Sequence, residues 1–412
     1  MPDTITACGH DTTTPPVRVC AHLTAVTGDD PVPDPIGVLT GHGLQHHIVC
    51  AGCDTPAALI CADCAADLHV TAWRGQPGIL ERPEPLHTTV SRWPLPPALG
   101  EVISLTPAGS AWLALTADGR IAELRPDTGS TVSLATVDVR SESPGEPWMG
   151  HTPSLRLLAS ADARFAAVVR DYGRFGQVLD LADGGRPTMT LDGGDHRPET
   201  VPFSAAFATV DGRTVLIHRT AWNRLDISDP ATGTLLTPRT HDLDYFHGRL
   251  HVSPGSRAIL DDGWVWHPVG IPQTWNLPAW LGTNPAEPEE GASLQALCQR
   301  AYHWDSGMCF IGDDRVALSG IGDDDDAMIP GARIFDVTTG TQLTAFAGPT
   351  GTFLSDGHRL YSTAGTTTHV WDPSTGHRTA TVPDFTPTCL HPGTGELATI
   401  TDGTLLRLQI KI

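Results

Sequence analysis

Six of the nine cysteines in this 412-residue chain lie near its N-terminus, and histidines accompany them. The candidate metal ligands are Cys8, His10, Cys20, His22, Cys50, Cys53, Cys61, Cys64 and His69. Thiolates and imidazoles are the donors that zinc prefers, and a Cys-x-x-Cys knuckle places two thiolates on one side of a tight turn. In a cytosolic chain, such clustering of cysteines favours metal over disulfides. We therefore predict a zinc-binding module over residues 1–85.

The number of thiol and imidazole donors indicates how many zinc ions the module binds. One tetrahedral site needs four donors, and the segment offers twelve or more thiols and imidazoles, so we predict two zinc ions. The simplest pairing gives one ion Cys50, Cys53, Cys61 and Cys64, and gives the other Cys8, His10, Cys20 and His22. Only seven residues separate Cys53 from Cys61, and this gap also suits a cross-braced arrangement in which alternate pairs share an ion. Four protein donors leave no open coordination position, so the predicted ions are structural.

After this segment, short apolar runs alternate with two recurring turns. One is an Asp-Gly pair, as at Asp118-Gly119 and Asp402-Gly403, and the other is an Asp followed by Thr-Gly, as in the turn that ends at Gly340. Glycine suits the positive φ of such turns, and Asp bonds to the local backbone. Strands joined by tight turns, recurring at roughly 35 to 55 residues, are typical of propeller blades.

The repeats predict an all-β fold, a seven-bladed β-propeller over residues 86–412, preceded by the small zinc-binding module. The expected blades cover residues 99–137, 155–191, 203–240, 245–280, 305–347, 351–383 and 386–412. The last segment supplies only three strands. We expect residues 87–93 to add the missing outer strand and close the ring.

Short motifs resemble known families. The run CAGCDTPAALICADCAADLH resembles the second half of a B-box finger, and Cys20-Ala-His22 resembles the opening of the ubiquitin-protease type of zinc finger. In the repeats, Trp371-Asp372 followed by Pro-Ser-Thr-Gly resembles a WD repeat, with a weaker version at Phe335-Asp336. These resemblances imply a role in binding proteins, peptide tails or ubiquitin.

Two segments exceed a minimal blade. They are residues 138–154, with Trp148 and Met149, and residues 271–304, with Trp275, Trp280 and one expected helix over 292–301. Loops on a rigid scaffold commonly hold binding residues, so these four side chains are our candidates for partner contact. The alternative is that the aromatic residues cover the side of the ring.

Charge and hydropathy exclude some functions. The chain has 26 basic and 47 acidic residues, a formal net charge of −21, and Lys411 is its only lysine. Without a basic stripe, nucleic-acid binding is not expected. No stretch approaches 18 apolar residues, and Met1 to His10 has no cationic segment followed by an apolar run, so we expect no membrane association and a cytoplasmic location. The arginine-for-lysine bias is typical of a GC-rich bacterial genome.

Familiar catalytic motifs such as Gly-x-Ser-x-Gly and His-Glu-x-x-His do not occur in the sequence. We therefore predict a non-enzymatic scaffold that binds a protein or peptide partner through the propeller face and its inserted loops. The alternative is an enzyme with a site in the propeller funnel or at an open zinc site.

Overall fold

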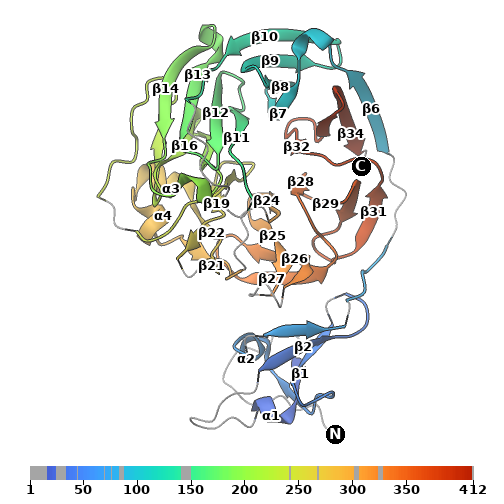
Figure 1. The fold of residues 1–412 in the computed structure, drawn as a ribbon. Coiled ribbons are helices and arrows are strands. Elements are labelled where there is room, and N and C mark those ends of the chain that lie inside the picture. Colours follow the sequence, from blue (N-terminus) through green and yellow to red (C-terminus); the bar gives the residue numbers. More distant parts are fainter. Residues whose placement is uncertain are drawn as a thin grey trace.

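The computed structural model describes residues 16–24, 34–43, 45–68, 70–75, 77–82, 88–140, 150–240, 243–266, 269–300, 306–322 and 328–410. Seven antiparallel sheets surround a central axis, and a small N-terminal module lies beside the ring (Figure 1). The predicted seven-bladed β-propeller is confirmed. In the part of the chain described, no helix is long and apolar enough to cross a membrane.

The first three blades follow the chain from the inner to the outer strand. Blade 1 contains β7 (Val102–Ala108), β8 (Ala111–Thr116), β9 (Arg120–Arg125) and β10 (Ser130–Thr136), after the short helix η1 (Pro97–Leu99). Blade 2 contains β11 (Ser154–Ala159), β12 (Phe165–Asp171), β13 (Phe175–Asp180) and β14 (Arg186–Asp192), with η2 (Leu181–Asp183) and η3 (Pro198–Thr200) in its connections. Blade 3 contains β15 (Ala205–Val210), β16 (Arg213–Ala221) and β17 (Arg224–Ser228), and a single bridge from Ser228 to Leu235 stands where its fourth strand would begin.

Blade 4 is the irregular one. It contains β18 (Leu250–Val252), β19 (Ala258–Asp261), β22 (Gln273–Asn276) and β23 (Gln295–Ala296), together with the hairpin of β20 (Trp264–Val265) and β21 (Val269–Gly270) and the helices α3 (Leu277–Gly282) and α4 (Glu287–Glu290). The helix expected over residues 292–301 is wrong, because this segment instead supplies β23 to the edge of the blade.

The last three blades are regular. Blade 5 contains β24 (Met308–Ile311), β25 (Arg315–Ile321), β26 (Ile329–Asp336) and β27 (Gln342–Ala347). Blade 6 contains β28 (Phe353–Ser355), β29 (Leu360–Ala364), β30 (Thr367–Trp371) and β31 (Arg378–Val382). Blade 7 contains β32 (Cys389–Leu390), β33 (Leu397–Thr401), β34 (Thr404–Ile410) and, as its outer strand, β6 (Thr88–Pro94).

The turns that predicted the blades are built by local hydrogen bonds. In the turn after β26, the Asp336 carboxylate accepts from the backbone N–H groups of Thr338 and Thr339 at 3.0 and 2.8 Å. Gly340 then donates its N–H to the Asp336 carbonyl at 2.9 Å with a φ of +67°. This closed turn returns the chain into the fourth strand of the blade.

The core lies between neighbouring blades. One cluster joins Leu113 and Leu115 of blade 1 to Leu157 and Val168 of blade 2, and similar clusters recur around the ring. Trp371 of blade 6 is fully buried, and its Nε1–H donates to the Ser362 hydroxyl at 2.9 Å. Each blade therefore packs on both of its neighbours.

The tryptophans of the second insertion belong to this core. Trp275 and Trp280 are 1% and 0% exposed, and their rings meet edge to face beside Ile259 and Leu277. This burial contradicts the expectation that they form an exposed contact surface, because packing against blades 3 and 4 removes both indoles from solvent. Trp148 and Met149 lie outside the described residues.

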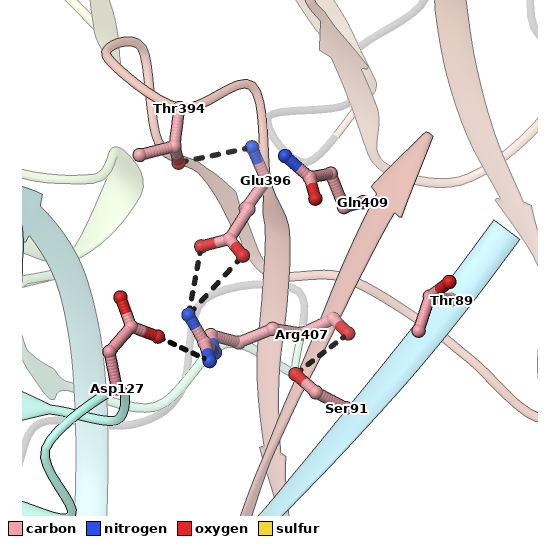
Figure 2. A pocket seen from close by; sticks show the side chains of 7 residues that line it. All are labelled: Thr89, Ser91, Asp127, Thr394, Glu396, Arg407 and Gln409. Carbon is pink, nitrogen blue, oxygen red and sulfur yellow. Dashed lines mark hydrogen bonds and ion pairs between the residues drawn. The ribbon is translucent and has the colours of Figure 1, made fainter. Parts of the chain in front are cut away.

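The two ends of the propeller meet in blade 7. β6 pairs antiparallel with β34 from Thr88 opposite Ile410 to Pro94 opposite Thr404. Next to this seam, Arg407 donates to Glu396, the residue before β33, at 3.2 Å and to Asp127 of blade 1 at 2.9 Å (Figure 2). The seam is thus held by a strand ladder and by an ion pair that crosses to the first blade.

The N-terminal module is a five-stranded sheet in the order β4-β1-β3-β2-β5. Its elements are β1 (Val17–Val19), α1 (Ala21–Thr24), β2 (Pro35–Leu39), β3 (His46–Cys50), β4 (Ala58–Ile60), α2 (Ala62–Ala66) and β5 (Ala72–Arg74). β1 pairs parallel with β3, whereas β2 pairs antiparallel with β3.

A segment that we name the strap, residues 78–82, joins the module to blade 6. On the module side, Gly78 exchanges backbone hydrogen bonds with Gly41 and Gly43 at 3.1 and 2.8 Å. On the ring side, the strap extends the outer edge of β31: Arg378 donates its N–H to the Leu80 carbonyl at 2.8 Å, and its own carbonyl accepts from Arg82 at 3.1 Å. The strap is therefore hydrogen-bonded to the module at one end and to blade 6 at the other.

Candidate metal centre

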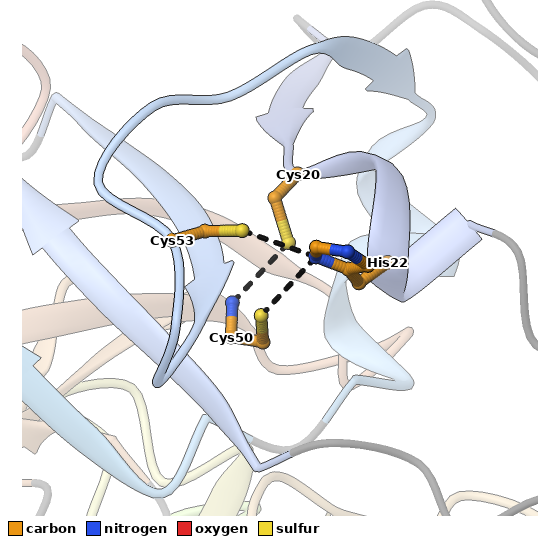
Figure 3. A group of neighbouring side chains, drawn as sticks. All are labelled: Cys20, His22, Cys50 and Cys53. Atoms are coloured by element: carbon orange, nitrogen blue, oxygen red, sulfur yellow. Dashed lines mark hydrogen bonds between the residues drawn. The ribbon is translucent and has the colours of Figure 1, made fainter.

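The ends of β1 and β3, with the segments that follow them, bring four of the predicted ligands together. Cys20 follows β1 directly and His22 lies in the one-turn helix α1, whereas Cys50 ends β3 and Cys53 follows a tight turn. The parallel pairing of β1 with β3 sets Val19 opposite Ile48, so both strands end at the same side of the sheet. The four side chains converge there (Figure 3).

Backbone hydrogen bonds fix this convergence. Cys20 donates its N–H to the Ile48 carbonyl at 3.0 Å, and Cys50 donates its N–H to the Cys20 sulfur at 3.2 Å. Cys53 donates its N–H to the Cys50 carbonyl at 2.9 Å, which closes the knuckle. Amide donors pointed at sulfur are typical of thiolate metal sites, where they stabilise the charged ligand.

The spacing of the donor atoms fits one tetrahedral ion. The Nδ1 atom of His22 lies 3.1 Å from the sulfur of Cys53 and 3.6 Å from that of Cys50, and all four donor atoms lie within 4.8 Å of one another. With Zn–S of about 2.3 Å and Zn–N of about 2.0 Å, a tetrahedron has N to S edges of about 3.5 Å and S to S edges of about 3.8 Å. The Cys3His set therefore matches a structural zinc site in donor type and in size.

The site is partly enclosed. Cys20 and Cys50 are buried, Cys53 is partly buried and His22 is exposed. Burial opposes ionisation of Cys20, but N–H donors from Cys50 and Leu23 outweigh it and lower the pKa of this thiol. A hydrogen bond with Cys50, with added burial, raises the pKa of Cys53 to about 11. Thiols this close cannot all ionise unless a cation compensates their charge, and a bound metal is such a cation.

The remaining predicted ligands are not in this group. Cys64 donates its N–H to the Cys61 sulfur at 3.3 Å across the start of α2, so this pair also forms a knuckle. Cys61 is buried and Cys64 is partly buried. Cys8, His10 and His69 lie outside the described residues.

The structure groups the second ligand pair with the third. The simplest pairing expected from the spacing placed Cys50 and Cys53 with Cys61 and Cys64, and the cross-braced alternative joined alternate pairs. Neither has the observed grouping. The reason is the register of β1 against β3, which places Cys20 beside Cys50 although they lie 30 positions apart in the sequence.

Comparisons with known proteins add little. No family model matches the chain, and no curated protein matches it. Among solved structures, a chain in the crystal structure of the mitotic checkpoint complex is similar, with a TM-score of 0.49 and 14% sequence identity, over 82% of this chain and 98% of that chain. A functional proposal therefore rests on the residues of this chain.

Proposed function

We propose that this chain is a zinc-stabilised interaction protein, in which a module over residues 1–85 holds structural zinc and a propeller over residues 86–412 binds a protein partner. The observation that supports it best is the cluster of Cys20, His22, Cys50 and Cys53 at distances that fit tetrahedral zinc. Four protein donors leave no coordination position for water or substrate, which favours a structural over a catalytic ion.

A second ion belongs to the proposal. Cys61 and Cys64 form a knuckle that supplies two of the four ligands of a tetrahedral site. Cys8 together with either His10 or His69 would supply the other two. A module of this size has a small core of its own, so metal binding supplies much of its folding free energy. Metal-binding thiols must stay reduced, which supports a cytoplasmic location.

Metal analysis tests the zinc sites. We expect two zinc ions per chain from protein expressed in zinc-containing medium, and one ion in Cys53→Ser and in Cys64→Ser. The matched control is Cys389→Ser, a cysteine of blade 7 far from the module, which should keep both ions. Full zinc content in Cys53→Ser would refute the cluster as a metal site.

The propeller fold supports the second half of the proposal, partner binding. A rigid ring with loops at both ends presents a preorganised surface. A tagged full-length chain recovered from its native host should retain a specific protein at a fixed ratio after washing. Recovery of the chain alone, under several growth conditions and with crosslinking, would contradict this role.

A further inference from the structure

A row of aromatic side chains crosses blades 3 and 4. The Trp222 and Phe246 rings lie 4.3 Å apart, Phe246 stacks on Trp264 at 4.3 Å and 18°, and Trp264 lies 5.5 Å from Trp266. We name Trp222, Phe246, Trp264 and Trp266 the aromatic row. Phe246 and Trp264 are buried and Trp222 is partly buried, but Trp266 is 49% exposed.

All of the row lies at one end of the blades. Trp222 is in the turn between the second and third strands of blade 3, Trp264 and Trp266 follow the second strand of blade 4, and Phe246 is in the connection between these blades. In an antiparallel blade these turns and connections share one end. Phe246 and Trp264 also exchange two backbone hydrogen bonds, at 2.8 and 3.0 Å, which hold the two central residues of the row together.

Arg197 covers part of this end. Its guanidinium carbon lies 4.9 Å from the centre of the Trp266 ring, in cation–π geometry. Arg197 is exposed and has a φ of +46°, a left-handed conformation that is unfavourable for a residue other than glycine. The backbone that places this guanidinium over Trp266 is therefore strained.

This inference rests on the proposed function: we propose that the face of Trp266 that Arg197 covers in the free chain binds an arginine-bearing, cationic segment of the protein partner, which takes the place of Arg197. The face of an indole attracts cations, and Arg197 demonstrates that a guanidinium fits there. No sequence signal singles out Trp266, because nothing in its local sequence distinguishes it from the buried Trp264.

Charge favours a cationic partner over an acidic one. The chain has a formal net charge of −21, so its long-range field attracts cations. Close to Arg197, Asp195 is exposed and Glu199 partly exposed, and neither forms an ion pair with any residue that the structure describes. Asp244, two residues before Phe246, is exposed as well. An incoming arginine would meet these carboxylates beside the indole.

Calorimetric titration of the full-length protein tests the proposal, with a short peptide of alternating arginine and glycine as the probe. Arg197→Ala should bind it about two- to fivefold more tightly, because the internal competitor is gone and an exposed cation–π contact has about this strength. Trp266→Ala should bind it more weakly than the wild type by at least the same factor. A glutamate–glycine peptide should not bind.

Two controls separate the aromatic row from general electrostatic attraction. Arg164→Ala removes the same charge from another exposed arginine, whose guanidinium lies over the buried Phe165, and should leave the affinity nearly unchanged. Leu343→Ala removes a 54% exposed apolar side chain from blade 5 and should also have no effect. Equal affinities of Trp266→Ala and wild type, or weaker binding by Arg197→Ala, would overturn the proposal.

The same variants separate this inference from the proposed function. If the native partner binds Trp266→Ala as well as wild type, the aromatic row is not the docking surface, although the chain still binds a partner. If no partner binds either protein, the proposed function itself fails.

Discussion

Removing the metal should destabilise the propeller as well as the module. Cys50, a member of the metal cluster, ends β3, which pairs with β2, and the residues after β2 hold Gly78 of the strap. A β-carbon on Gly78 would lie 2.7 Å from a ring nitrogen of His42, so only glycine permits this approach. Disorder in the module would therefore release the strap from blade 6.

The free energy of unfolding that the propeller would lose can be summed from the strap contacts. The two backbone hydrogen bonds with Arg378 contribute about 1 kcal/mol each. Ile79 packs beside Trp371, and its partial burial adds about 1 kcal/mol. The ion pair of Glu81 with Arg378 is exposed and contributes almost nothing. A loss of about 3 kcal/mol corresponds to a decrease of about 4–5 °C in the Tm of a domain this long.

Differential scanning calorimetry with and without a strong chelator measures this decrease, and Cys53→Ser should reproduce it without chelator. Hydrogen exchange gives the location, since the amide of Arg378 should lose protection while those of β34 keep theirs. Cys389→Ser serves as the control and should respond to chelator as wild type does. A propeller Tm and an Arg378 exchange rate that chelation leaves unchanged would refute the coupling.

Further predictions concern the propeller itself. Burial raises the pKa of Asp262 to about 6 despite its ion pair with Arg300, so the folded chain binds a proton between about pH 6 and 4 that the unfolded chain does not. Across that window, wild type should gain stability relative to Asp262→Asn as pH falls, and urea unfolding at several pH values checks the sign. Gly376→Ala should destabilise more than Gly365→Ala, because both have positive φ but only the first new β-carbon would lie 2.6 Å from Phe346. Urea midpoints that are equal for the two variants would contradict this.

The ring could be predicted because its signals are local. The end of a strand is marked by an Asp whose carboxylate accepts hydrogen bonds within its own turn, as Asp336 does, and by a glycine with positive φ a few residues later. This signal is the same in every blade that has the turn. Blade 3, whose fourth strand is reduced to the bridge at Leu235, still has this turn at Gly233. Turn chemistry thus predicts a blade even where the pairing is incomplete.

Long-range relations could not be predicted in the same way. The cluster of Cys20 with Cys50 depends on a parallel strand pairing that no spacing of cysteines specifies. Trp275 and Trp280 are as apolar as the exposed Trp266, and only their neighbours in blades 3 and 4 decide that they are buried. The candidate zinc ligands were therefore easier to nominate than to group, and two of the four residues nominated for partner contact, Trp275 and Trp280, are buried.

The connection between module and ring has two attachments on neighbouring blades. Its first part, the strap, lies along the outer edge of β31 in blade 6, and its later part is β6, the outer strand of blade 7. An outer strand exposes unpaired backbone groups that can recruit other chains, and the strap covers part of one such edge. Because the strap is anchored to the sheet that holds the cysteine and histidine cluster, metal binding would stabilise the outer edge of blade 6, next to the blade where the ring closes. The same geometry predicts that metal-depleted protein exposes the edge of β31 and aggregates before the ring unfolds.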